Sequence, residues 1–401
     1  MSAVAPSSAP APRSSFAVLA GTAWAAVVAA SLFILSQTDL LPEGPDEWTH
    51  DWRTLLFSDR AEKQRDDIAV VLVSDDSLAR YPYRSPIDRA LLARAIRGLD
   101  AAGVRAIGVD VIFDQPTEPE KDQALIKAAR EARAPIVFGA TDGRLSRARP
   151  EALAYQREFL AATGRPAGHI FFGSDLKRLT LSDRVVRRVG KPSTEPDYAL
   201  SFAEQAARAV GANVAAPAPL IDWLLPPDEV TDAFLRLPIR PHEPAPADAD
   251  PAAVIPPEWT RALAGKIVLL GGDFADRDTH LTPLNINGGE RFPGVMIHAQ
   301  ILAQTLDGRA LTPTPRPIEA VALFLIAALG FYAARRWTWM RSEWIVYISG
   351  LAALILVGAI AFSAYKIIVP TSTLLLAWFA GVWGGYHCDR ALGAVGVRRT
   401  A

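Results

Sequence analysis

Residues 67–116 read DIAVVLVSDDSLARYPYRSPIDRALLARAIRGLDAAGVRAIGVDVIFDQP and carry the clearest structural pattern in the chain. Two bounded apolar, β-branched runs at 68–73 and 104–109 predict buried strands, and apolar residues at 87–99 recur on one face of a helix between them. The pair Ala102-Gly103 ends that helix. A strand, a helix and a second strand in this order form a βαβ unit, so we expect two parallel strands that are neighbours in an open sheet.

Aspartates follow both predicted strands. Asp75 and Asp76 come after the first strand, and Asp110 and Asp114 come after the second. Ligands of open α/β sheets bind in the crevice beyond the carboxyl ends of the strands, so this acidic edge is a candidate site for a divalent cation or a cationic small molecule. The alternative is structural, because Asp76 is suited to cap the next turn and Asp114 to form an Asx turn.

A later strand, predicted at 265–272, is also followed by acids. Asp273 comes directly after it. Asp276, Asp278 and His280 alternate along the next segment, where they could line one side of an extended chain as a loose metal site. No tight ligand spacing such as HExxH or CxxC supports a metal there, so the metal signal is weak.

Two further residues are candidate ligand contacts. His298 begins a helix predicted at 296–306, where a structural hydrogen bond is the alternative role. Arg84 precedes Ser85 and Pro86, which we expect to be the N-cap and the first residue of the helix that follows. Arg84 has no role in starting this helix, so we expect it to contact an anion or to form a salt bridge with the acidic edge.

The pattern between residues 121 and 306 predicts a doubly wound α/β domain with a mostly parallel sheet. We also expect an inserted β section near 170–174 and 184–188, and irregular structure at 214–258, which is rich in Pro, Ala and Asp. The other predicted elements are helices at 121–133, 151–162 and 198–210 and a strand at 135–140.

Hydrophobic residues make up 50% of the chain, with a mean hydropathy of +0.15, and they are concentrated at its two ends. Residues 16–36 contain no charge and are long enough to span a bilayer, although a secretory signal is the alternative. Three more apolar runs of spanning length follow the domain, at 318–334, 344–364 and 367–386. A stiff, Pro-rich segment at 312–317 connects the domain to them. We expect one transmembrane helix before the domain and three after it.

Arginines set the expected orientation in the membrane. Three of them connect the first two C-terminal runs and three follow the last run, so the positive-inside rule places both groups in the cytoplasm. These are Arg335, Arg336, Arg341, Arg390, Arg398 and Arg399. Counting the spans back from the C-terminus places the domain, residues 37–315, outside the cytoplasm. It places two tails in the cytoplasm: a disordered one at 1–15 and a second one at 387–401.

The composition argues against several other classes of protein. A net charge of -1 and the lack of a basic patch interleaved with aromatic residues give no reason to expect nucleic-acid binding. One cysteine, Cys388, excludes an internal disulfide framework. The sequence has no P-loop, GxSxG or kinase motif, and we expect no catalytic residues.

Several motifs, in order along the chain, resemble the CHASE type 2 family of extracellular sensor domains associated with cyclases and histidine kinases. The segments are the 67–116 stretch, SDRVVRRV, YALSFAEQ, LAGKIVLLGG, DRDTHLTPL and FPGVMIHAQILAQTLDGR. The plan of one span before the domain and three after it also looks like this family. One departure is at Asp183-Arg184, where the resemblance would put a glycine after the aspartate. The resemblance places these residues on the family's motifs: Asp75, Asp76, Arg84, Asp110, Asp278, Thr282, Pro283 and His298.

The resemblance implies a bacterial receptor in the cell inner membrane, with an extracytoplasmic sensor domain that binds an unknown small molecule or ion. Such domains are often joined to a cyclase or kinase, whereas this sequence stops at Ala401, so we expect a separate effector or a homo-oligomer to supply the output. We expect no cofactor, with a divalent cation left open. Two other functions also stay open: a scaffold for a partner protein in the membrane, and a metal-dependent extracytoplasmic hydrolase built on Asp75, Asp110, Asp278 and His280.

Overall fold

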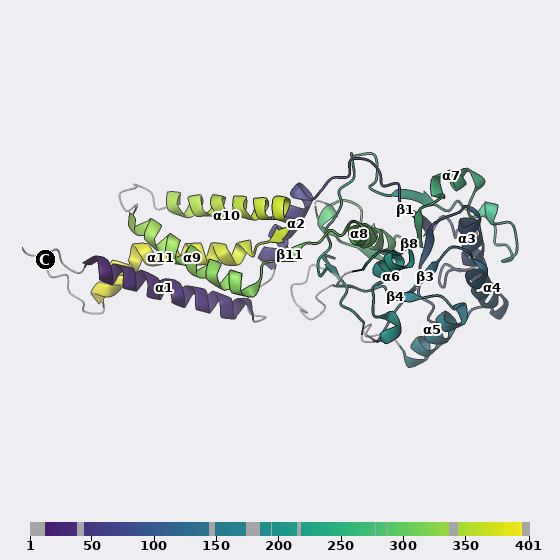
Figure 1. Ribbon diagram of the computed structural model, residues 1–401, viewed down its shortest axis with the longest axis horizontal. Coiled ribbons are helices and arrows are strands. Elements are labelled where there is room, and N and C mark those ends of the chain that lie inside the picture. The colour runs from purple at the N-terminus through teal and green to yellow at the C-terminus, as the bar shows by residue number, and fades with distance from the viewer. Residues whose placement is uncertain are drawn as a thin grey trace, which may run out of the picture. The chain divides into compact units, whose positions relative to one another are not determined.

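The computed structural model describes residues 13–37, 44–143, 149–173, 185–193, 195–214, 218–276, 278–286, 288–336 and 344–394. The chain forms two compact units, which Figure 1 shows as ribbons. One unit is Thr54–Thr312, and the other combines Met1–Arg53 with Pro313–Ala401.

A parallel sheet forms the centre of the Thr54–Thr312 unit. Among the described residues it has six strands, in the order β4-β3-β2-β8-β1-β7. The strands are β1 (Ile68–Ser74), β2 (Ala106–Asp110), β3 (Ile136–Ala140), β4 (Ala167–His169), β7 (Leu235–Pro238) and β8 (Ile267–Asp273). All of their carboxyl ends therefore meet at one edge of the sheet.

The strands β1 and β2 are parallel, as the βαβ pattern predicts, but they are not neighbours. β8 lies between them, because Leu269 is aligned with Val70 of β1 on one side and with Gly108 of β2 on the other. The predicted pairing of β1 with β2 is wrong. β8 is apolar and buried on both faces, so it takes the centre of the sheet, and the pattern of residues 67–116 carries no information about a strand supplied later in the chain.

Helices cover both faces of the sheet (Figure 1). Ala69 and Val71 of β1 pack into a core with one set of helices, and Val70 and Leu72 pack into a second core with the other set. The first set is α3 (Arg89–Ala101), α4 (Pro119–Glu131) and α5 (Pro150–Thr163), and the second is α6 (Phe202–Ala209) and α8 (Gly294–Asp307). Burial on both sides explains the uninterrupted apolar runs of the strands. The α/β fold with a parallel central sheet is as predicted.

The start of α3 differs from the prediction. Asp88 is the N-cap, since its carboxylate accepts a hydrogen bond from the amide of Leu91 at 3.0 Å, and the helix begins at Arg89. Ser85 and Pro86 lie before the helix, so the predicted cap at Ser85 is wrong. Asp88 can satisfy a free amide of the first turn directly, and this fixes the start of the helix one turn later.

Two of the less regular regions contain short strands. β5 (Phe172–Gly173) pairs antiparallel with β6 (Arg188–Val189), which agrees with an inserted β section. The departure at Asp183-Arg184 lies outside the described residues. β7 falls within the 214–258 region that we expected to be irregular, because its LRLP sequence becomes a strand only by pairing with β1. The remaining short elements of this unit are η1 (Pro196–Tyr198), η2 (Pro251–Ala253), η3 (Pro257–Trp259), α7 (Thr260–Leu263), β9 (Thr279–His280), η4 (Pro283–Asn285) and β10 (Phe292–Pro293).

The second unit is built from long helices. Among the described residues these are α1 (Arg13–Ser36), α9 (Arg316–Arg336), α10 (Trp344–Tyr365) and α11 (Thr371–Ala394). Three are long and apolar enough to cross a membrane: Val18–Ser36 within α1, α9 and α10. The last apolar run was expected to begin at residue 367, but residues Ile367–Ile368 form the short strand β12, next to β11 (Thr312–Pro313), and α11 starts only after Pro370.

The helix α11 packs directly on α1 and α9. A side chain at Gly381 of α11 would collide with the carbonyl of Ala327 in α9, so the two backbones touch. Trp24 of α1 donates a hydrogen bond from its indole nitrogen to the carbonyl of Ala380 at 3.0 Å. Small residues at such contacts are typical of helices that associate within membranes.

The helix α2 (Gly44–Phe57) begins in the second unit and is bonded there to the start of α11. The carboxylate of Asp46 accepts hydrogen bonds from the amide of Ser372 at 2.6 Å and from the hydroxyl of Thr373 at 3.1 Å. Arg53 donates to the carbonyl of Val369 at 3.1 Å. Asp46 thereby satisfies an amide that α11 leaves free in its first turn.

Candidate functional site

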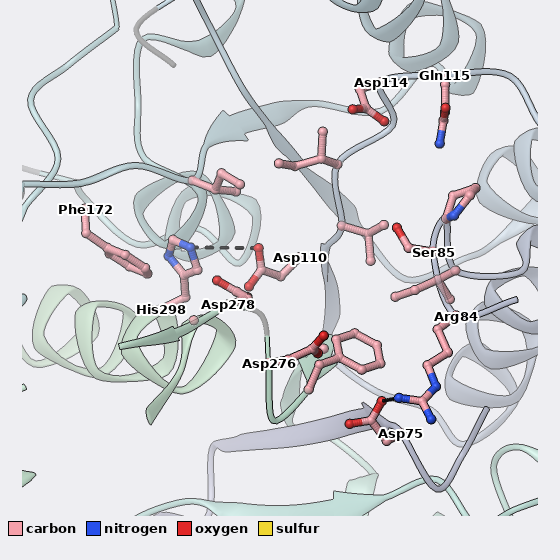
Figure 2. Close-up of a pocket in the computed structure, with 18 residues that line it drawn as sticks. Asp75, Arg84, Ser85, Asp110, Asp114, Gln115, Phe172, Asp276, Asp278 and His298 are labelled. Atoms are coloured by element: carbon pink, nitrogen blue, oxygen red, sulfur yellow. Dashed lines mark hydrogen bonds and ion pairs between the residues drawn. The ribbon is translucent and has the colours of Figure 1, made fainter. Parts of the chain in front are cut away.

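A cavity of about 750 Å³ lies at the carboxyl edge of the sheet (Figure 2). Segments that follow β1, β2, β4 and β8 form its wall, together with the start of α8. This volume is within the range of sites that hold small organic ligands. The charged residues in the wall are Asp75, Arg84, Asp110, Asp114, Asp276 and Asp278.

One end of the cavity, which we name the His298 end, contains Asp110, Asp278, His298 and Phe172 (Figure 2). Asp110 is the last residue of β2, and its side chain is only 6% exposed. The Nε2 atom of His298 lies 3.9 Å from the Asp110 carboxylate, which is too far for a hydrogen bond. Among the described residues neither Asp110 nor His298 has a side-chain hydrogen-bond partner, so two polar groups of the wall are left unsatisfied.

Burial disfavours the charged form of both groups. It raises the pKa of Asp110 well above the usual carboxyl range, and the nearby Asp278 carboxylate raises it further. Burial also lowers the pKa of His298 to about 3, with smaller contributions from His169 and His280. We therefore describe Asp110 and His298 as a neutral acid beside a neutral imidazole rather than as a salt bridge.

Asp278 is held in place by its own loop. Its backbone adopts the left-handed region with φ of 52°, and its carboxylate accepts a hydrogen bond from Nε2 of His280 at 3.0 Å. Gly294, the first residue of α8, makes room for it, because a Cβ atom there would lie 2.7 Å from both carboxylate oxygens. The lack of a side chain at Gly294 thus brings Asp278 to the His298 end.

The opposite end of the cavity, which we name the Arg84 end, contains Asp75 and Arg84 (Figure 2). Nη1 of Arg84 donates to Asp75 at 2.6 Å, and the amide of Ala275 donates to the other carboxylate oxygen at 3.3 Å. The side chain of Arg84 is 63% exposed. The charges of Asp75 and Arg84 therefore neutralise each other. At the His298 end, by contrast, Asp110 has no charged partner of opposite sign among the described residues.

Apolar side chains complete the wall. The ring of Phe172 lies 4.6 Å from the ring of His298 and 5.2 Å from that of His280, measured between centroids. Ile170, which follows β4, and Phe274, which follows β8, also line the cavity. The site can therefore enclose an apolar body as well as a polar group.

A family model for the CHASE2 domain matches residues 24–332 of the chain. The chain belongs to the CHASE2 family. This confirms the resemblance drawn from the motifs, and it covers the whole sheet together with parts of α1 and α9. CHASE2 is a family of sensor domains. No curated protein and no solved structure matches the chain.

The CHASE2 fold brings six of the nine predicted site residues to the cavity, namely Asp75, Arg84, Asp110, Asp114, Asp278 and His298. Three lie elsewhere. Asp76 is exposed in a turn, where its carbonyl accepts a hydrogen bond from Ala79 at 3.2 Å. The carboxylate of Asp273 lies 3.8 Å from the guanidinium group of Arg236. His280 is outside the wall and donates a hydrogen bond to Asp278.

Two motif residues of the resemblance serve the local structure. Thr282 is the N-cap of the short helix η4, since its hydroxyl accepts a hydrogen bond from the amide of Leu284 at 3.3 Å. Pro283 is the first residue of that helix. Neither residue is part of the cavity wall.

The sequence interpretation missed Phe172, Phe274 and Gly294 as site residues. Nothing in the local pattern distinguishes an aromatic residue of a core from one that lines a cavity. Gly294 gave a weak signal, because a glycine that opens a helix often permits a close approach. Within the described ranges, no group of three or more His, Cys, Asp or Glu side chains is arranged to hold a metal ion.

Proposed function

We propose that this CHASE2 protein is a membrane-anchored sensor subunit. In this proposal the cavity at the sheet edge binds a small signal molecule outside the cytoplasm, and the membrane helices pass the bound state to a separate effector protein. The observation that carries the proposal is the roughly 750 Å³ cavity with an unsatisfied, nearly buried Asp110 in its wall. A buried carboxyl group without a hydrogen-bond partner destabilises the ligand-free protein, and a ligand that bonded to it would remove this destabilisation.

The extracytoplasmic position of the cavity is argued from charge. Arg335 and Arg336 end α9, and further arginines follow α11 in the sequence, whereas the segment between α10 and α11 has a single Lys366. Since cytoplasmic loops carry the excess of basic residues, the sheet domain belongs on the opposite side of the membrane. This requires α11 to span as well, and its direct packing on α1 and α9 supports that assignment.

A route for the signal is available in the second unit. Thr314 precedes α9 and donates two hydrogen bonds to the carbonyl of Ile368, at 3.0 Å from its amide and 2.8 Å from its hydroxyl. A shift of the connector at 312–317 would therefore act on both α9 and α11. Ligand binding would favour one of two arrangements of these helices, and the effector would recognise that arrangement.

The orientation can be tested by thiol labelling of intact cells. Val230 is 95% exposed, so Val230→Cys in a Cys388→Ser background gives one accessible thiol in the sheet domain. We expect a membrane-impermeant maleimide to label Val230→Cys in intact cells. The native Cys388, alone in the unaltered chain, is the matched control and should react only after lysis. The reverse pattern would overturn the proposal.

The relay can be tested by purification from native membranes. We expect a cyclase, kinase or similar effector to be recovered with the full chain and to be lost when the three C-terminal membrane helices are replaced by an unrelated span. Recovery of the same partner with both proteins would instead mean that the sheet domain holds the partner, which contradicts a relay through the helices.

A further inference from the structure

The described part of the cavity wall is acidic. Among the residues that the structure describes, five aspartates line the cavity together with one arginine, Arg84, and Arg84 is already paired with Asp75. His298 cannot supply the missing positive charge, because burial keeps its imidazole neutral. The wall therefore favours a ligand that carries a positive charge.

The His298 end locates this charge. Asp110 and Asp278 lie together there, and Asp278 disfavours ionisation of Asp110 (Figure 2). Asp278 has His280 as a donor, whereas Asp110, 6% exposed, has no donor among the described residues. A cationic group between the two carboxyls would give Asp110 a partner and would form charge-assisted hydrogen bonds with both residues.

The rest of the wall indicates what the cation is attached to. Ile170, Phe172 and Phe274 provide apolar surface, and the volume of about 750 Å³ is much larger than a bare metal ion requires. The ring of Phe172, beside His298, also offers an aromatic face to a cation. An anion is disfavoured, since Arg84 is occupied by Asp75 and the amide of Gly294, the first residue of α8, already donates to the carbonyl of Asp278 at 3.1 Å.

We propose that the cavity binds a small organic amine with an apolar body, and that its ammonium group sits between Asp110 and Asp278. This inference rests on the proposed sensor function and specifies the ligand class. Neutral compounds of the same shape bind weakly because they leave Asp110 without a charged partner. Compounds with a carboxylate are excluded by the surrounding acids.

The test is calorimetric titration of the full chain in nanodiscs. The probes are phenethylamine and butylamine, with phenethyl alcohol as a neutral match, phenylpropionate as an anionic match, and Mg²⁺ and Ca²⁺ as bare cations. We expect at least one amine to bind at least ~10-fold more tightly than phenethyl alcohol and phenylpropionate. Asp110→Asn and Asp278→Asn should each weaken amine binding by at least ~10-fold.

Asp76→Asn removes one carboxylate at an exposed position outside the cavity wall, so it is the matched control and should change amine binding by less than ~3-fold. A melting curve for each variant checks that it is folded, and Asp110→Asn is nearly isosteric with the neutral acid that it replaces. The inference is overturned if neither amine binds at up to ~10 mM, if a neutral or anionic probe binds as well as the amines, or if a metal ion takes the site at one per chain.

These failures are distinguishable from failure of the proposed function. Tight binding of phenethyl alcohol or phenylpropionate, unaffected by Asp110→Asn, would refute the amine and leave the sensor proposal standing. Labelling of Val230→Cys only after cell lysis would refute the extracytoplasmic sensor whatever the titrations show.

Discussion

Asp75 and Asp110 stand at equivalent places in the fold, at the carboxyl ends of two buried parallel strands, and both line the same cavity. Asp75 is bonded to Arg84 and to a backbone amide, so it holds the Arg84 end together. Asp110 has no hydrogen-bond donor within the described part of the chain and is far less exposed. The fold thus places carboxylates at the sheet edge, but the groups around each one determine whether it stabilises the protein or is available to a ligand.

Of the variants that test this difference between Asp75 and Asp110, Gly294→Ala is expected to have the largest effect on amine affinity. The new Cβ would approach both carboxylate oxygens of Asp278 to 2.7 Å and would push this side chain away from Asp110. We expect calorimetry to show a loss of amine affinity of more than about tenfold, because one of two charge-assisted contacts is removed. Gly289→Ala is the control, since its nearest contact, at 3.4 Å from Asn285, leaves room for a methyl group. Equal affinities in the two variants would show that Asp278 does not contact the ligand.

The next effect is a dependence of amine affinity on pH. Asp110 has a raised pKa in the empty cavity and must ionise to bind a cation, so affinity should increase as pH rises through that pKa, by up to about tenfold per pH unit. Within the described ranges, Asp278 and His298 are the other titratable groups beside Asp110, and His169 and His280 act in turn on His298. His298 has a pKa of about 3, so it stays neutral over this range. Titrations from pH 5 upward should show the slope in the native protein and none in Asp110→Asn.

A smaller effect is expected on stability without ligand. Because the pKa of Asp110 is raised on folding, its contribution to stability is complete below the carboxyl value of the unfolded chain and is lost as pH rises through the folded value. Asp110→Asn keeps the shape of the neutral acid, so it should stabilise the protein by about 1–3 kcal/mol at alkaline pH and by almost nothing near pH 4.

Thermal unfolding of the purified full chain at both pH values measures this effect. Asp76→Asn is the control, since Asp76 is exposed and outside the cavity wall. A melting temperature for Asp110→Asn that is unchanged or lower at alkaline pH would show that the empty site tolerates the ionised carboxylate.

The smallest effect is expected at the Arg84 end. The ion pair between Asp75 and Arg84 is partly exposed to solvent, and such pairs stabilise proteins by at most about 1 kcal/mol. A double-mutant cycle of Asp75→Asn and Arg84→Gln, measured by thermal unfolding, should give a coupling energy of this size. A coupling well above it would mean that the two ends of the cavity differ less than their hydrogen bonds indicate.

Local periodicity predicted most of the individual elements. The strand β1, the helix α3 and the strand β2 follow from apolar spacing, because burial on one or both faces imposes that spacing on the sequence. The order of the strands in the sheet could not be predicted from local periodicity, because β8 lies between β1 and β2 but comes from a distant part of the chain. The edge strand β7 was missed for a similar reason, as its sequence is strand-like only beside β1.

The candidate site was predictable to the extent that it depends on strand ends. Asp75, Asp110 and Asp278 were nominated because each follows a strand of the sheet, and the fold gathers them at one cavity. Asp76 could not be separated from Asp75 in this way, because the direction of a turn decides which of two adjacent acids faces the crevice. The role of Phe172 depends on which side chains are brought beside it from elsewhere, and no local pattern records that.

The central position of β8 also constrains how the domain is made. During synthesis β1 and β2 emerge early, and each must wait with one edge unpaired until the segment containing β8 has left the ribosome. The sheet cannot close before that, so the chain has no complete core while its first half is being translated. In the extracytoplasmic location that we propose for the domain, this delay would keep the polypeptide unfolded, and so able to pass a translocation channel, until nearly the whole domain has crossed.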